Sequence, residues 1–158
     1  MKKEEYGEQF NEHLLEQYKL YVEMADRISD RRERTNMFYI SLLSVFLTLI
    51  FIVMGMNVLN EFQIVVLFII ISILGFALCI IWYIHIRSYR QLNSGKFKVI
   101  HEMEQYLPFS FYIKECDILI KKKESNGYIL LTKVEQYVPL IFAILFAFNI
   151  FITYSSFL

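Results

Sequence analysis

Few residues of this 158-residue chain combine the type and spacing that catalysis or ligand binding needs. Glu102 and Glu104 could act as a general acid and base, but two residues apart on a helix they point to different faces. Lys121, Lys122 and Lys123 could attract a polyanion such as a phosphate, because adjacent ammonium groups add their fields. No glycine-rich loop accompanies them, and a solvated basic turn is the competing interpretation. We therefore expect no enzymatic activity.

The cysteines and the histidine closest to the apolar stretches have no partners at metal-ligand spacing. Cys79 lies within an apolar stretch and Cys116 within a polar one, so they are not expected to pair. His85 follows the apolar stretch and is interpreted as an interfacial side chain rather than a proton relay. The sequence thus predicts no catalytic residue, no metal site and no bound cofactor, and shows no sign of nucleic-acid binding.

Three windows that lack Asp, Glu, Lys and Arg set the architecture: residues 35–60, 62–86 and 136–158. Each is long enough to cross a bilayer, which needs about 20 apolar residues in one helix. The most apolar stretch, residues 63–84, cannot face water. We predict an all-α membrane protein with three transmembrane helices. Secondary transporters and proton pumps are disfavoured because they usually need ionisable groups inside the spans.

Lysine and arginine are unevenly distributed: seven precede the first window and nine lie between the second and third. By the positive-inside rule, the N-terminus and the 87–135 segment are predicted to be cytoplasmic. The 57–62 loop and the C-terminus are then outside. An aromatic belt is predicted at the cytoplasmic interface, comprising Phe38, Tyr39, Trp82, Tyr83 and Tyr137.

Residues 1–34 read as a cytoplasmic amphipathic helix that runs unbroken into the first span. Its apolar stripe advances in steps of four and three, through Phe10, Leu14, Gln17, Tyr21, Met24 and Ile28. Packing against protein is favoured over lying on the membrane surface, because the opposite face is acidic and anionic lipid would repel it.

Small polar residues recur within the spans. Ser41, Ser44 and Thr48 share one helix face, and Asn149 and Thr153 share another. Such residues either hold neighbouring membrane helices together or bond their own backbone. For Asn149 we expect an interhelical partner. The candidate oligomer-interface residues are Phe10, Leu14, Tyr21, Met24, Ile28, Ser41, Ser44, Thr48, Asn149 and Thr153.

The segment between the second and third spans is predicted to be helical. A helix over 87–106 continues the second span and stops at Leu107-Pro108, because proline cannot continue a helix. A short helix over 114–123 follows, and Ser125-Asn126-Gly127 predicts a turn. The chain thus divides into 1–34, 35–60, 62–86, 87–135 and 136–158.

Two blocks of sequence resemble the RipA family octameric membrane proteins. The first is YRQLNSGKFKVI at 89–100, with the LP step at 107–108, and the second is TKVE at 132–135, before the final span. The matching motif positions are Tyr89, Arg90, Leu92, Asn93, Lys96, Phe97, Glu104, Leu107, Pro108, Thr132, Glu135 and Pro139. The resemblance implies a bacterial inner-membrane protein that forms a ring-like homo-octamer with no assigned enzymatic activity.

Architecture and resemblance together predict a homo-oligomeric membrane assembly. One hypothesis is a pore-like octamer that changes membrane permeability during stress or phage infection. The alternative is a membrane scaffold or adaptor that recruits a cytoplasmic protein through its basic helical segment. Membrane lipid and further copies of the chain are the partners expected under either hypothesis.

Overall fold

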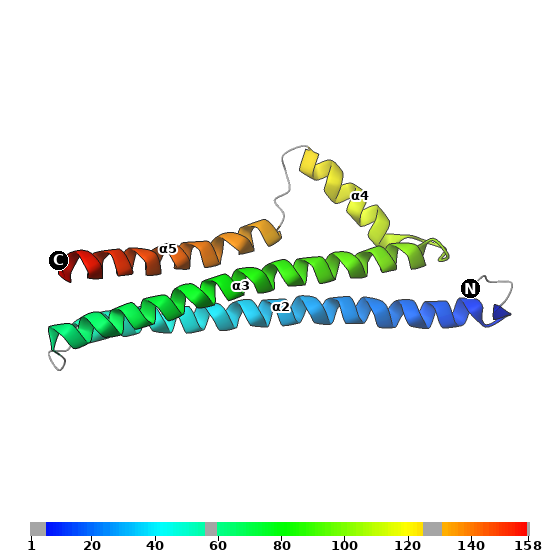
Figure 1. Cartoon of the computed structure of the whole chain (residues 1–158). Helices are drawn as coiled ribbons and strands as arrows, with labels where there is room; N and C mark the ends of the chain where they lie inside the picture. The colour runs from blue at the N-terminus through cyan, green and yellow to red at the C-terminus, as the bar shows by residue number, and fades with distance from the viewer. Residues whose placement is uncertain (1–5, 56–59, 125–130, 158) are drawn as a thin grey trace. The chain divides into compact units, whose positions relative to one another are not determined.

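The computed structural model describes residues 6–55, 60–124 and 131–157, and in this part of the chain it contains helices and no strand. The side chains of residues 122–124, 131–133 and 156–157 lie outside the description. The predicted turn at 125–127 and the side chains of Lys122, Lys123 and Thr132 therefore fall outside the described residues. The helices follow one another as α2, α3, α4 and α5 (Figure 1).

Two of the helices are unusually long. α2 spans Phe10–Gly55 and α3 spans Glu61–Glu104. Glycine and proline are absent between residues 8 and 54, so nothing in the backbone interrupts α2 before Gly55. Gly95 does not interrupt α3. The prediction that the N-terminal helix runs unbroken into the first apolar window is confirmed, as is the helical continuation of the second.

The two remaining helices are shorter and start earlier than the sequence pattern predicts. α4 spans Phe111–Glu124, and α5 spans Leu131–Phe157 with Pro139 inside it. Pro139 lies in the third turn of α5 and has no N–H, so the helix lacks the backbone hydrogen bond from residue 139 to the carbonyl of residue 135. The start of α4 at Phe111, rather than at Lys114, has a cause that lies on another helix and is described below.

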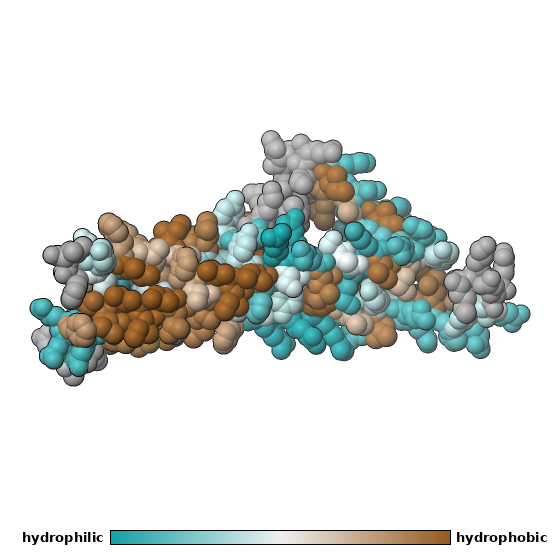
Figure 2. Space-filling view, viewed as in Figure 1, coloured by the Kyte–Doolittle hydropathy of each residue, from teal (hydrophilic) through white to brown (hydrophobic). Residues whose placement is uncertain are grey.

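Three helices are long and apolar enough to cross a membrane among the described residues: Phe10–Gly55, Glu61–Glu104 and Val134–Ser155. The predicted all-α membrane protein with three spanning helices is confirmed. In these apolar windows only 17% to 22% of the residues are buried, so most apolar side chains face outward. Figure 2 shows hydrophobic side chains gathered over the apolar parts of the helices, and mainly hydrophilic ones elsewhere.

The chain packs as two units. The polar unit comprises Met1–Arg32 and Tyr89–Leu130, and the span unit comprises Glu33–Ser88 and Leu131–Leu158. Each unit therefore contains part of α2 and part of α3. The polar unit adds α4, and the span unit adds α5.

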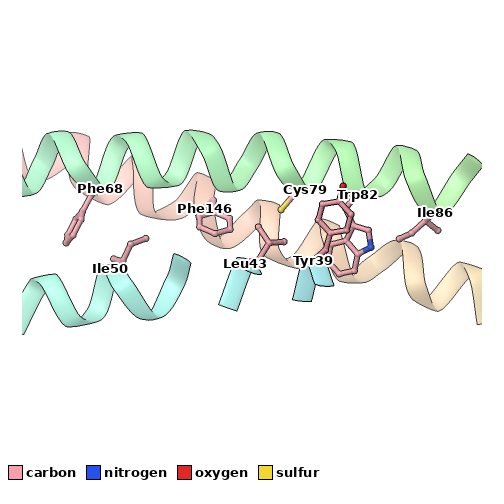
Figure 3. Close-up of a cluster of buried hydrophobic side chains, with 8 residues drawn as sticks. All are labelled: Tyr39, Leu43, Ile50, Phe68, Cys79, Trp82, Ile86 and Phe146. Atoms are coloured by element: carbon pink, nitrogen blue, oxygen red, sulfur yellow. The ribbon is translucent and has the colours of Figure 1, made fainter. Parts of the chain in front are cut away.

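The core of the span unit lies between α2, α3 and α5 (Figure 3). Its buried members are Tyr39, Leu43, Ile50, Phe68, Cys79, Trp82, Ile86 and Phe146. On α2 and α3 they recur at steps of three, four, seven and eleven residues, which return to the same side of a helix. α3 and α5 approach closely at Gly75, where a Cβ would lie 2.5 Å from the ring of Phe146.

Candidate functional site

A layer of hydrogen-bonded aromatic residues lies at one end of the span-unit core. Trp82 donates its Nε1–H to Oδ1 of Asn36 at 2.9 Å. The Tyr39 ring stacks on Trp82 with centroids 5.5 Å apart and planes 10° apart. The Tyr39 hydroxyl is 3.3 Å from Nδ1 of His85. Buried indole and phenol groups need hydrogen-bond partners, and the bonds made here fix the register between α2 and α3.

The five predicted belt aromatics therefore differ in their surroundings. Tyr39 and Trp82 are buried in the core, whereas Phe38, Tyr83 and Tyr137 are exposed at the surface of the span unit. The sequence pattern located all five near one end of the spans but could not separate the inward-facing pair from the outward-facing three. No sequence pattern indicated that Asn36 would be the partner of Trp82.

Two of the polar side chains inside the spans bond within their own helices, whereas the buried Ser72 hydroxyl has no partner among the described residues. Thr48 donates its hydroxyl to the carbonyl oxygen of Ser44 at 2.8 Å, and both residues are exposed, as is Ser41. Thr153 donates to Oδ1 of Asn149 at 3.1 Å, one turn earlier on α5. Oδ1 of Asn149 is thus satisfied within its own helix, and the interhelical partner expected for the Asn149 amide stays a prediction for its Nδ2 donors.

In the polar unit, Glu104 binds three elements together. It is fully buried, and Oε1 accepts hydrogen bonds from the Tyr18 hydroxyl at 3.0 Å and from the backbone N–H of Tyr112 at 2.9 Å. Oε2 accepts from the N–H of Ile113 at 3.1 Å. The first N–H groups of a helix have no partner inside that helix. Glu104 at the end of α3 therefore caps α4 while it also binds α2.

This cap explains where α4 begins. Ser110 precedes α4 and has the residue type of a local cap, but its hydroxyl donates to the carbonyl oxygen of Glu104 at 3.3 Å instead. The carboxylate of Glu104 takes the capping position, and a negative charge there is favoured by the helix dipole. α4 can therefore begin at Phe111, before the stretch in which the sequence pattern predicts it.

The environment of Glu104 also changes the chemistry of Tyr18. Burial, followed by the hydrogen bond to Glu104, raises the pKa of Tyr18 to about 12. Burial is also the largest cause of the raised pKa of Tyr112, and the charges of Asp26, Glu115 and Glu104 add to it. The Tyr18 phenol remains a neutral donor across the physiological range, so its hydrogen bond to Glu104 persists there.

The predicted N-terminal stripe packs against α3 within the same polar unit. The rings of Phe10 and Tyr106 meet edge to face at 6.4 Å, and the Lys96 ammonium lies 4.5 Å from the centre of the Tyr21 ring. Ile28 is buried, whereas Met24 is 42% exposed. Much of the stripe that was expected to join copies of the chain is thus covered inside one protomer.

The family-motif positions fall into buried and exposed groups. Lys96 contacts Tyr21, Phe97 packs on Tyr112, and Pro139 is fully buried in the span unit. The buried Oδ1 of Asn93 has no hydrogen-bond partner among the described residues. Arg90, Leu92 and Pro108 are exposed, and Leu107 is half-buried. Glu104 accepts three hydrogen bonds on its carboxylate, and in the sequence only the family motif and its spacing from Glu102 singled it out.

A groove runs between α3 and α4 in the polar unit and has a volume of about 480 Å³. Its floor is apolar, and its α3 side carries Lys98 and His101. No group of three His, Cys, Asp or Glu side chains among the described residues is placed to hold a metal ion. The groove is thus suited to a peptide or helix surface rather than to a small charged ligand.

Comparison with known proteins gives one family. The sequence model of the octameric membrane protein family (8xMP) matches residues 15–156, all but the ends of the chain. Comparisons with curated proteins and with solved structures find no match. The family's name agrees with the three apolar helices and with apolar surface left uncovered in a single copy. The chain therefore belongs to the octameric membrane protein family and is a membrane protein that assembles with copies of itself.

Proposed function

We propose that eight copies close into a ring in the bacterial inner membrane and that this ring controls membrane permeability. The observation that carries the proposal is the outward-facing apolar surface of three charge-free spans in a chain whose family is octameric. Lipid covers part of this surface, and neighbouring copies cover the rest. A closed ring is the common way for identical subunits to satisfy such surfaces without leaving a free end.

The size of such a ring supports a central opening. If each copy places one helix on the inner circle, and neighbouring helices are about 10 Å apart, eight axes lie on a circle of radius roughly 13 Å. Subtracting the helix radius of about 5 Å leaves an opening on the order of 15 Å across. A ring of eight helices therefore leaves a central opening without protein, and lipid or water must occupy it.

The composition of the spans favours a closed resting state. Their exposed side chains are chiefly large and apolar, including Val45 on α2, Leu74 on α3 and Phe148 on α5. Lipid tails rather than water fill an opening with such walls, so ions do not cross it until the wall moves or becomes polar. We propose stress or phage infection as the setting in which the ring opens.

Ion flux into liposomes that contain the purified octamer tests the proposal. Serine replaces Val45, Leu74 or Phe148, one helix at a time. The variant whose residue faces the opening should conduct at least tenfold more than the unaltered protein, because a hydroxyl keeps water in the passage. The matched controls Val45→Leu, Leu74→Ile and Phe148→Leu should remain closed. Intact octamers that stay impermeable in every variant would exclude the permeability role.

A scaffold is the second candidate, and exposed residues on α4 favour it. Ile118 and Ile120 are 55% and 49% exposed beside the cations Lys114 and Lys121. Isolated apolar residues with basic neighbours suit an acidic protein partner. Affinity capture should then recover one partner at a fixed ratio to the octamer, and Ile118→Asp should release it. Recovery of the octamer alone would count against this role.

A further inference from the structure

Carboxylates cover the side of α2 that faces away from α3. They are Glu12, Glu16, Glu23, Asp26 and Asp30, and all are exposed. At 100° per residue they fall within an arc of roughly 80°, centred opposite the stripe that packs on α3. Among the described residues, Glu23 is the member of this group that forms a salt bridge, with Arg27 at 2.8 Å. Lys19 lies within the same arc, and Glu23 and Asp26 also line a pocket with Phe111 and Tyr112 of α4. We therefore call only the part around Glu12 and Glu16 the outer face of α2.

The outer face also carries an apolar side chain. Leu15 is 43% exposed and follows Glu12 by three residues, which places the two side by side on the helix. A leucine with carboxylates along one side suits a surface whose centre is apolar and which has one basic edge. Leu20, which is 59% exposed, lies on a different side of the same helix and provides a natural comparison.

The groove between α3 and α4 has the complementary properties. Phe97, Cys116 and Leu119 contribute to its apolar floor, and Lys98 and His101 form its α3 rim. Glu115 lies on the α4 side, so the basic character belongs to the α3 rim alone. The groove is open, and no described segment of the chain occupies its volume of about 480 Å³.

Ring symmetry identifies the occupant as a second copy of the chain. In a closed ring of eight, each protomer offers one surface and receives its neighbour with a different one. The outer face of α2 and the α3–α4 groove are two different surfaces of the same polar unit, and the carboxylates Glu12 and Glu16 are opposite in charge to Lys98 on the α3 side of the groove. A helix laid in an apolar groove is a common form of recognition between proteins.

We propose that the outer face of α2 in one protomer docks in the α3–α4 groove of the next. Leu15 lies on the apolar floor, and Glu12 and Glu16 lie beside Lys98 and His101. The charges set the direction and register of the contact, which then repeats around the ring. The inference rests on octameric assembly and is independent of whether the ring conducts ions.

Oxidative cross-linking in membranes tests the contact, because Cys116 already lies in the groove. In Leu15→Cys, each protomer carries one cysteine on its outer face and one in its groove. Mild oxidation should give a ladder of products that continues beyond the dimer. Leu20→Cys should give at least tenfold less product, and Leu15→Cys combined with Cys116→Ser should give no ladder. A product that stops at the dimer, links within one chain, or forms equally from Leu20→Cys would overturn the proposal.

A charge exchange tests the same contact without cysteines. Glu12→Lys and Lys98→Glu should each reduce the octamer fraction, measured as mass in gentle detergent, by about half or more. The double variant Glu12→Lys/Lys98→Glu should restore it. Lys98→Glu combined with Asp117→Lys, on the far side of α4, should restore nothing. Octamers that persist unchanged in both single variants, or a double variant no better than either, would contradict the pairing.

Discussion

Glu104 shows how a single carboxylate can organise a unit with few buried side chains. Its two oxygens accept three hydrogen bonds, from α2 and from the first turn of α4, while its own backbone ends α3. Hydrogen bonds to a charged group contribute more to folding stability than bonds between neutral groups. Leaving a buried donor without its partner lowers that stability. Glu102, two residues earlier, is exposed and makes none of these contacts.

Replacing Glu104 should release α4. We expect Glu104→Ala to destabilise the polar unit by about 3 kcal/mol, because two helix N–H groups and a phenol lose their acceptor. Glu104→Gln keeps one acceptor oxygen and should have a smaller effect. Hydrogen exchange of the Tyr112 and Ile113 amides measures the loss directly. The matched control Glu102→Ala should change stability by less than about 0.5 kcal/mol. Equal exchange rates in the two alanine variants would refute the capping role.

The raised pKa of Tyr18 predicts a stability change at high pH. The folded protein holds the phenolic proton up to a pKa of about 12, against about 10 for the unfolded chain. This stabilisation is complete below about pH 10 and is lost as the pH rises towards 12. The melting temperature should therefore fall more steeply over that window in the unaltered protein than in Tyr18→Phe. Parallel slopes would show that Tyr18 does not titrate in this way.

Among the elements, α3 and α5 approach so closely at Gly75 that no side chain fits between them. The Phe146 ring occupies the space where a Cβ would be. Gly95, on the same helix, has nothing within 4 Å of its Cβ position. Substitution of Gly95 therefore tests the effect of backbone freedom alone, whereas substitution of Gly75 also tests the effect of packing.

Alanine at these two positions should have opposite effects. Gly75→Ala should destabilise the span unit by about 1–3 kcal/mol through overpacking, whereas Gly95→Ala should stabilise its helix by up to about 1 kcal/mol. Thermal unfolding in detergent, followed by circular dichroism, compares them. Phe146→Leu should relieve part of the Gly75→Ala defect. A Gly75→Ala variant as stable as the unaltered protein would mean that α5 does not dock here.

The helices could be predicted from the sequence where the cause is local, and not where it is distant. Charge-free windows and the absence of glycine and proline locate α2, α3 and α5, although α2 begins at Phe10 and α5 at Leu131 rather than at the predicted residues 1 and 136. The predicted start of α4 was wrong because its cap is Glu104, which lies on another helix. Sequence patterns reveal only a capping residue that directly precedes the helix in the chain. The partner of Asn149 depended on a side-chain rotamer, which spacing alone does not determine.

For the whole molecule, the charge distribution predicts which side of the membrane each end faces. An impermeant thiol reagent applied to intact cells should label Leu158→Cys and leave Cys116 unlabelled, because basic segments remain in the cytoplasm. Permeabilised cells provide the control, since both positions should then react. Labelling of Cys116 but not of residue 158 in intact cells would mean that the chain inserts in the opposite direction.

Trp82 is the sole tryptophan of the chain, and it is 1% exposed in the span-unit core. Its ring contacts α2 through Tyr39 and Asn36, and α5 through Phe142. Fluorescence excited at the red edge of the absorption band therefore reports from one place, where three membrane helices meet. Separation of any of them admits lipid or water beside the indole and shifts its emission, so the protein carries its own optical probe of whether the spans stay closed together.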